Sequence, residues 1–115
     1  MPVREVTPDM YKLCFFVPES HLETVKQAVF DAGAGRIGDY DCCCWQVRGE
    51  GQFRPLAGSD PFLGAQGRLE RVDEFRVELV CDEEAIRPAI AALYRAHPYE
   101  EPAWDAVALA NNSLR

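Results

Sequence analysis

The sequence predicts an α+β fold in which two helices cover one face of a four-stranded antiparallel sheet. Some segments alternate apolar and polar residues with the two-residue period of a strand, and two others repeat apolar residues at helical spacing. The segments follow one another in the order β-α-β-β-α-β, which is typical of the ferredoxin-like architecture. At 115 residues the chain is long enough for one such two-layer domain and too short for two.

The composition is that of a globular domain with an acidic balance. Hydrophobic residues make up 48% and charged residues 27% of the chain, which is ordinary for soluble proteins. The net charge is −7 and the basic residues are scattered, whereas nucleic-acid binding needs clustered Lys and Arg. No apolar run approaches the roughly 18 residues that span a membrane, and no secretory signal is recognisable. We therefore expect a cytoplasmic protein that binds neither nucleic acid nor membranes.

The first part of the chain is predicted to hold a leader, a strand and a helix. Residues 1–9 contain two prolines and no periodicity, so they are expected to be a flexible leader to a single domain over 10–109. Residues 10–17 are β-branched and aromatic, with apolar residues on one face, and predict the first strand. Ser20 and Glu23 have the spacing of a capping box, and an amphipathic helix follows until a glycine pair ends it.

The middle of the chain is predicted to hold two strands separated by a long loop. Residues 36–48 alternate and predict the second strand, and residues 68–81 predict the third. Residues 49–67 contain five glycines and two prolines and are interpreted as a loop, in which Phe53 and Phe62 are apolar anchors that pack on something. A loop of this length in a compact domain is usually functional or part of an interface.

The last part is predicted to hold a helix, a corner and a final strand. Asp82 suits the N-cap of a helix with an apolar stripe, although Pro88 conflicts with a regular helix because it removes a hydrogen bond. The helix is expected to end at His97, since Pro98 follows it. A last strand is predicted from residue 104 to 109, and residues 110–115 are expected to be a frayed tail.

The sheet face opposite the helices is predicted to carry Phe16, Cys42, Cys44 and Val80. Such a face is too apolar to be left in water and usually meets another subunit. We therefore expect a homo-oligomer.

The six-residue stretch from His97 to Pro102 concentrates titratable side chains on a stiff corner. It holds His97 before the first of two prolines, and Tyr99, Glu100 and Glu101 between them. One interpretation is a ligand-binding site formed by these four residues, in which His97 and Glu101 bind a divalent metal ion such as Zn or Cu. The other is a structural corner in which His97 makes hydrogen bonds that hold the chain.

The five cysteines are interpreted as reduced thiols. Their number is odd and three are consecutive, at positions 42–44, which does not suit the disulfide framework of a secreted protein. Cys42 and Cys44 would face the same way on the predicted second strand, and soft metals such as Cu(I) or Zn bind such thiols. Alternatively both thiols are buried and inert, because free cysteine is among the most buried residue types.

Several stretches occur in the order found in a known family. They are GAGRIGDY at 33–40, GEGQFRP at 49–55, PFLG at 61–64 and HPYEEPAWD at 97–105. Together they resemble the inserted middle domain of the NGG-interacting-factor family, also named type 2 homologues of GTP cyclohydrolase I, from about Tyr11 to Leu109. The resemblance implies a fold similar to CutA and the PII signalling proteins, a CutA-like His-Pro-Tyr-Glu corner, and a trimer. The family's dinuclear metal site belongs to flanking halves, so its presumed hydrolase chemistry is not carried over.

These observations predict an oligomeric PII/CutA-like module that binds a small ligand or regulates a protein partner, and that is not an enzyme. By analogy with PII proteins, residues 49–67 would be the loop that contacts a partner. The first alternative is a divalent metal-ion protein that uses the His97 corner. The second is a hydrolase-related enzyme inherited from the full-length family.

Overall fold

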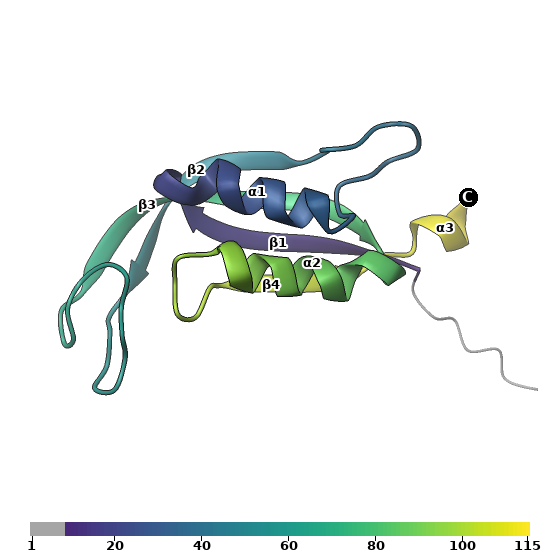
Figure 1. Cartoon of the computed structure of the whole chain (residues 1–115). Helices are drawn as coiled ribbons and strands as arrows, with labels where there is room; N and C mark the ends of the chain where they lie inside the picture. Colours follow the sequence, from purple (N-terminus) through teal and green to yellow (C-terminus); the bar gives the residue numbers. More distant parts are fainter. Residues whose placement is uncertain (1–8) are drawn as a thin grey trace, which may run out of the picture.

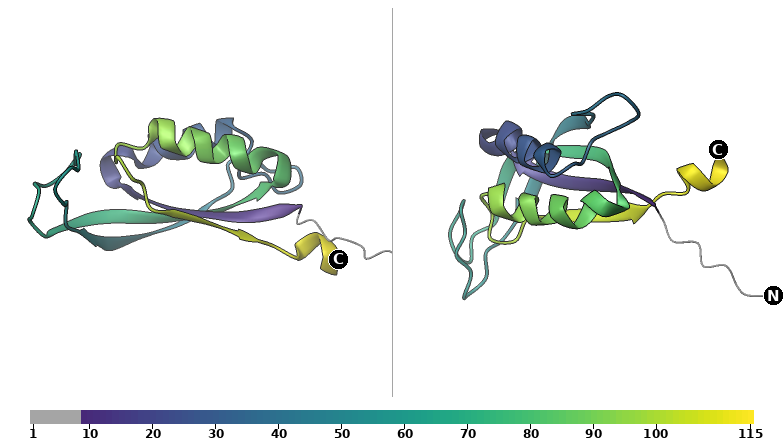
Figure 2. Two further views of the ribbon diagram at one scale, coloured as in Figure 1. Left: turned by 90° about the horizontal axis from the view of Figure 1, so that it is seen from below. Right: turned by 45° about the vertical axis from the view of Figure 1, so that its right-hand side comes forward.

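The computed structural model describes residues 9–115, so the predicted leader lies outside the described residues except for Asp9. Four strands form one antiparallel sheet with the order β2-β3-β1-β4. Their bounds are Met10–Pro18 for β1, Trp45–Phe53 for β2, Glu70–Asp82 for β3 and Trp104–Ala108 for β4. Helices α1 (Leu22–Asp31) and α2 (Glu83–Ala96) both lie on one face of the sheet, as Figures 1 and 2 show. The predicted ferredoxin-like class is confirmed.

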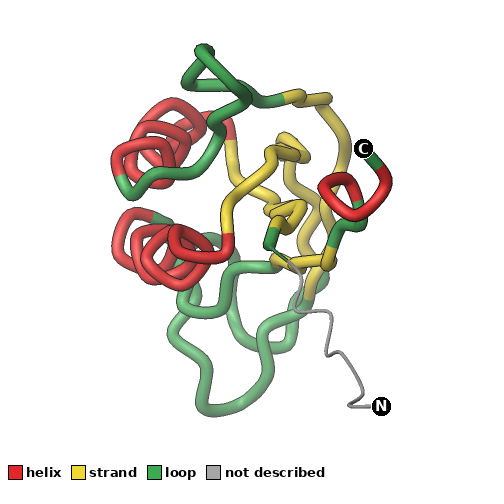
Figure 3. Tube along the Cα trace, turned by 90° about the vertical axis from the view of Figure 1, so that its right-hand side faces the viewer, coloured by secondary structure: helices red, strands yellow, loops and turns green. Residues whose placement is uncertain are grey.

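The core lies between this sheet face and the two helices, which Figure 3 shows on one side of the strands. Every second residue of β1 points into it, and Leu13, Phe15 and Val17 are fully buried. The apolar stripes of α1 and α2 cover them, with Val25, Val29, Ala89 and Leu93 at 0% exposure. The apolar side chains placed by the two-residue period of the strand and by the helical spacing of the stripes therefore pack together in one core.

Strand β1 is central, and its end positions the corner after α2. Its residue Phe15 pairs with Val77 of β3 on one side and with Trp104 of β4 on the other. Just beyond that pair, the Phe16 N–H donates to the Ala103 carbonyl over 3.2 Å. The backbone of Phe16 therefore lies directly beside the segment that joins α2 to β4.

Helix α2 begins after Asp82, as predicted, although the Asp82 side chain makes no capping hydrogen bond. The helix runs through Pro88 without a break, and the Pro88 side chain is exposed. It ends at His97, whose backbone is extended at φ −72° and ψ 136°. This ending agrees with the restriction that Pro98 places on the residue before it.

The predicted second strand is wrong in position. The strand is Trp45–Phe53, nine residues that include Gly49 and Gly51, and the connection between β2 and β3 is therefore residues 54–69. Residues 36–44 form an irregular loop instead, in which Ile37 bridges to Tyr40. Gly38 has φ 56° and Cys42 has φ 54°, and both values lie in the left-handed region that no strand contains.

Two smaller predictions also differ from the structure. The capping box of Ser20 is wrong, because a 3₁₀ turn at Glu19–His21 precedes α1 and the Ser20 hydroxyl bonds to the His21 ring over 2.8 Å. The predicted tail contains a short helix, α3, at Asn111–Leu114.

The outer sheet face is more mixed than predicted. Phe16 and Val80 lie on it, and exposed Trp45 and Val47 extend its apolar surface, with exposures of 60% and 43%. Cys42 and Cys44 precede β2 and do not belong to this strand surface. Charged residues also lie on it, namely Lys12, Glu74, Arg76, Glu78 and Asp105.

Candidate functional site

His97 connects the end of α2 to the end of β1. The side chain is buried at 6% exposure, and its Nε2 lies 2.7 Å from the Phe16 carbonyl oxygen. Its Nδ1 accepts a hydrogen bond of 3.1 Å from the Tyr99 backbone N–H. Because a backbone N–H can only donate, the ring proton is on Nε2, which donates to Phe16. Both ring nitrogens therefore serve to fix the corner.

The surroundings of His97 favour its neutral form. Burial lowers the pKa of the imidazole below its ordinary value, and His21 contributes to the same shift. The hydrogen bond to the Phe16 carbonyl opposes this shift without cancelling it. A neutral ring is also the form that the Nδ1 contact requires, since a protonated Nδ1 would face the Tyr99 N–H.

The fixed corner places Tyr99 at the centre of a cluster of aromatic side chains. The Tyr99 ring centroid is 4.8 Å from that of His97, 6.1 Å from Phe53 of β2 and 6.3 Å from Phe62 in the β2–β3 loop. The hydroxyl oxygen of Tyr99 is buried beside the Glu74 carboxyl, and no hydrogen bond of standard geometry reaches it from the described residues. Buried hydroxyl groups are normally paired, and the Glu74 carboxyl is the polar neighbour of this one.

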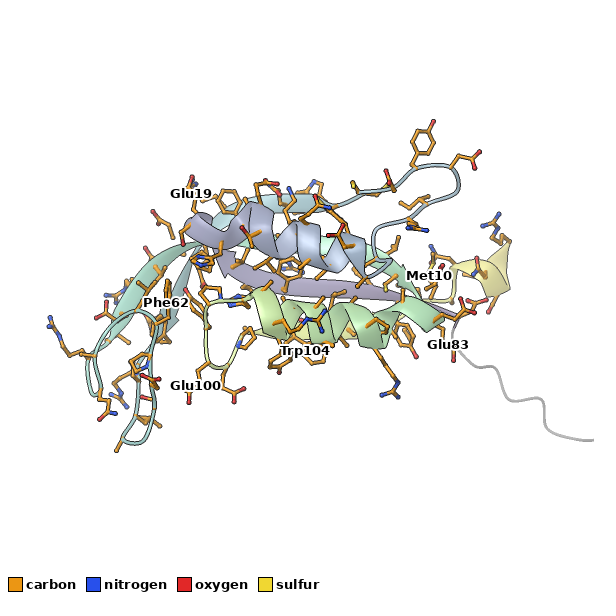
Figure 4. All side chains as sticks on the ribbon, viewed as in Figure 1. Met10, Glu19, Phe62, Glu83, Glu100 and Trp104 are labelled. Carbon is orange, nitrogen blue, oxygen red and sulfur yellow. The ribbon has the colours of Figure 1, made fainter. Side chains whose placement is uncertain are left out.

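The β2–β3 loop, residues 54–69, folds back onto the corner. The Asp60 N–H donates to Glu100 Oε2 over 3.0 Å, and the Phe62 ring meets His21 edge-on at 5.4 Å. Inside the loop, the Ser59 hydroxyl donates to the Leu56 carbonyl over 2.6 Å. Figure 4 shows Phe62 and Glu100 at the same end of the molecule, on the loop and on the turn after α2. Segments about forty residues apart in sequence therefore form one site.

A cavity of about 220 Å³ lies between the loop, the corner and strand β3. Its lining is Gln52, Phe53, Ser59, Pro61, Phe62, Leu63, Glu74, Tyr99, Glu100, Glu101 and Ala103. We call this cavity the corner pocket. It contains three carboxylates and three aromatic rings, and Lys, Arg and His are absent from the lining.

Two ionisable groups of the corner pocket hold their protons more tightly than usual. Burial raises the pKa of the Glu74 carboxyl, and hydrogen bonding by the Tyr99 hydroxyl opposes that shift. Burial also raises the pKa of the Tyr99 hydroxyl, and the nearby charge of Glu74 adds to it. The Glu74 carboxylate lies directly against Gly51, where a Cβ atom would overlap it.

The structure brings together three of the four residues predicted for the site. Tyr99, Glu100 and Glu101 line the corner pocket, whereas His97 lies behind Tyr99 and supports it. Glu74 was not predicted for the site, because in the sequence it belongs to an alternating strand like any other surface residue. Phe53 and Phe62 were recognised only as anchors of the loop, and it is the docking of that loop that turns them toward the corner.

The predicted metal ligands are not gathered into a cluster. Within residues 9–115, no group of three or more His, Cys, Asp or Glu side chains is arranged to hold a metal ion. A metal ion at His97 would have to displace one of the two hydrogen bonds of its ring, so binding by His97 and Glu101 stays a prediction. Cys42 is exposed and lines a different cavity from Cys44, which contradicts the predicted common face.

No protein-family model matches the chain. A GTP cyclohydrolase 1 type 2 homolog of Halalkalibacterium halodurans is 45% identical over 105 residues, which are 91% of this chain and 28% of the relative. The protein of the same name in Mycobacterium leprae is 50% identical over 98 residues, 85% of this chain and 26% of the relative. The chain is a relative of one segment of these proteins. The resemblance inferred from the motifs is confirmed, and the chain spans about a quarter of the length of its relatives.

Solved structures agree with this relationship. A Bacillus cereus protein related to NIF3 superposes with a TM-score of 0.76 at 40% identity, over 93% of this chain and 27% of the other. CutA from Xylella fastidiosa has a TM-score of 0.65 at 20% identity, covering 92% of this chain and 91% of that protein. The B. subtilis GlnK–ATP complex has a TM-score of 0.61 at 10% identity, with coverages of 92% and 86%. The last two likenesses concern the fold alone, and they show that the domain has a CutA/PII-like fold.

In the part of the chain that the structure describes, the helices are too short or too polar to cross a membrane.

Proposed function

We propose that this domain is a binding module whose ligand enters the corner pocket and sets the position of the β2–β3 loop. The observation that carries the proposal is the pocket itself, because it combines aromatic walls with a buried Tyr99 hydroxyl that lies beside Glu74 and makes no hydrogen bond of standard geometry. Binding sites are typically concave and mostly apolar, with a few convergent polar groups that fix the orientation of the ligand.

The β2–β3 loop links ligand binding in the pocket to the surface that a protein partner would contact. A ligand in the pocket would contact Phe62 and would therefore add contacts to the loop. This loop is now attached to the corner through the Asp60–Glu100 hydrogen bond and the Phe62 ring. Leu56 and Leu63 are exposed on the same loop and offer apolar surface to a protein partner. Ligand occupancy would therefore change the loop surface that a partner meets.

The outer sheet face supports a second part of the proposal, which is self-association. Trp45, Val47 and Val107 are exposed on it at 60%, 43% and 54%. Large exposed apolar patches with charged residues around them are typical of protein interfaces. The family resemblance implies a trimer, and we propose that this face is where the subunits meet.

An NMR screen of a few hundred chemically mixed fragments tests the pocket without assuming a ligand class. We expect hits that shift the backbone amides of residues 52–63, 74 and 99–103, and loss of these hits in Phe62→Ala. Leu56→Ala is the matched control, because Leu56 is exposed on the same loop and does not line the pocket. Hits that map to another surface, or a screen without hits, would contradict the proposed site.

A further inference from the structure

We propose that the ligand of the corner pocket is a small organic cation with an apolar body, such as an alkylammonium group. This inference rests on the proposed function and adds the chemical class of the ligand. It draws on the charges, the aromatic walls and the buried hydroxyl of the pocket.

The charge of the lining has one sign. Glu74, Glu100 and Glu101 line the pocket, whereas Lys, Arg and His are absent from it. Glu100 Oε2 accepts the Asp60 N–H, so this carboxylate is fixed in direction rather than free to turn into solvent. An anion such as a phosphate would meet only repulsion here, because phosphate sites need basic side chains or helix N-termini.

The walls suit a cation that also carries apolar groups. Phe53, Phe62 and Tyr99 surround the space, with the ring centroids of Phe53 and Phe62 at 6.1 and 6.3 Å from that of Tyr99. Aromatic faces attract ammonium groups within about 6 Å, and groups of such rings recognise alkylated ammonium ions. A bare metal ion would not use these rings, whereas an alkylammonium ion would use both the rings and the carboxylates.

The buried Tyr99 hydroxyl supplies a second kind of contact. Its polar neighbour is the Glu74 carboxyl, and its oxygen keeps lone pairs that can accept a hydrogen bond from an N–H or O–H group of the ligand. The raised pKa of Glu74 agrees with this picture, since an added cation would stabilise the charged form of that carboxyl. The cavity volume of about 220 Å³ equals roughly seven water molecules at ~30 Å³ each, which limits the ligand to a small molecule or a single side chain.

The test compares the binding of two probes that have the same shape and different charge, and it uses the whole chain. Choline and 3,3-dimethylbutan-1-ol differ by one atom, a charged nitrogen in place of a carbon. We expect choline to shift the amides of the corner pocket in NMR titrations and to bind at least tenfold more tightly than the alcohol. Glu74→Gln and Glu100→Gln should each weaken choline at least threefold and leave the alcohol within twofold.

Two glycines of β2 provide a matched pair of positioning variants. A Cβ at Gly51 would displace the Glu74 carboxylate, whereas a Cβ at Gly49 would meet nothing within 4 Å. Choline affinity should therefore fall in Gly51→Ala and stay unchanged in Gly49→Ala. Because Glu74 is a flexible side chain, both variants should remain folded, and thermal unfolding checks this.

The outcomes separate this inference from the proposed function. If the alcohol binds as tightly as choline, or phenyl phosphate binds more tightly than either, the cationic ligand is wrong while the pocket remains a binding site. If choline shifts amides elsewhere, or shifts none, the inference is also overturned. The fragment screen then shows whether the pocket binds ligands of another class. Comparing n-butylammonium with acetyl-Gly-Lys-Gly-amide identifies the source: tighter binding of the peptide indicates a lysine side chain of a protein, and equal or weaker binding indicates a free amine.

Discussion

At the scale of single residues, His97 and Tyr99 have different roles in the site. His97 uses both ring nitrogens to join the end of β1 to the corner after α2, through Phe16 and Tyr99. Its ring is buried behind Tyr99 and does not line the pocket. Tyr99 takes its position from that arrangement and presents a buried hydroxyl that makes no hydrogen bond of standard geometry. The imidazole therefore contributes stability, and in the proposed function the phenol contacts the ligand.

The stability of the corner should depend on pH through His97. Its folded pKa is lowered from 6.5, so below that pH the unfolded chain binds the proton more readily than the folded chain. The free energy of unfolding should therefore fall as the pH drops from about 6.5 toward the folded pKa. Urea unfolding between pH 7.5 and 5 measures this loss, which should be absent in His97→Gln and retained in His21→Gln. Parallel pH profiles for the wild type and His97→Gln would contradict the role of His97.

The Tyr99 hydroxyl should cost stability in the absence of ligand. Removing a buried hydroxyl that makes no hydrogen bond of standard geometry relieves a desolvation penalty of about 1–3 kcal/mol, so Tyr99→Phe should leave the free energy of unfolding unchanged or raise it. Tyr94→Phe is the control, because the Tyr94 hydroxyl accepts a 2.9 Å hydrogen bond from Trp104 Nε1 and its loss should cost about 0.5–1.5 kcal/mol. A larger loss in Tyr99→Phe than in Tyr94→Phe, measured by urea unfolding, would show that the Tyr99 hydroxyl has a partner after all.

At the scale of elements, helix α2 contains a proline, Pro88, which is unfavourable inside a helix. Pro88 is the sixth residue of a fourteen-residue helix, where it lacks the N–H that would bond to the preceding turn. The helix persists because Ile86, Ala89 and Leu93 are buried against the sheet. Tertiary packing therefore outweighs local preference in this element.

Pro88→Ala should stabilise the protein. The replacement restores one helical hydrogen bond and loses no packing because Pro88 is exposed, so we expect a gain of about 1–2 kcal/mol after the smaller entropic advantage of proline in the unfolded chain is subtracted. The exposed neighbour provides the control, and Arg87→Ala should change the free energy of unfolding by less than about 0.5 kcal/mol. A loss of stability in Pro88→Ala, by chemical unfolding, would mean that the proline helps to shape this helix.

The loop before β2 depends on close approach at Gly35. This residue has φ 77°, its N–H donates to the Val80 carbonyl over 2.8 Å, and a Cβ would lie 2.7 Å from the Phe30 ring. Gly38 also has a positive φ, at 56°, but a Cβ there would meet nothing within 4 Å. Gly38→Ala should cost about 1 kcal/mol from backbone strain, and Gly35→Ala at least about 1 kcal/mol more. Equal costs in thermal unfolding would show that the close approach does not matter.

At the scale of the whole molecule, the sequence predicted the fold class because the periods of β1, β3 and the two helices each agree with their final burial. It misplaced β2, since Tyr40, Cys42 and Cys44 alternate like a strand while the backbone at Cys42 turns into the left-handed region. The corner was recognised because its residues are consecutive. Phe62 was not assigned to the site, because it joins the site only when the β2–β3 loop docks on the corner. Glu74 was not assigned to it, because its position on β3 beside Tyr99 follows from the packing of the corner on the sheet.

Two proposals concern the whole molecule, namely that the domain assembles through its outer sheet face and that it holds a small ligand under its loop. Native mass spectrometry of the untagged protein tests both at once, with Phe62→Ala as the comparison. We expect more than one copy of the chain in the assembly and one small molecule of additional mass per copy, which Phe62→Ala loses. A monomer that carries no additional mass would contradict the account.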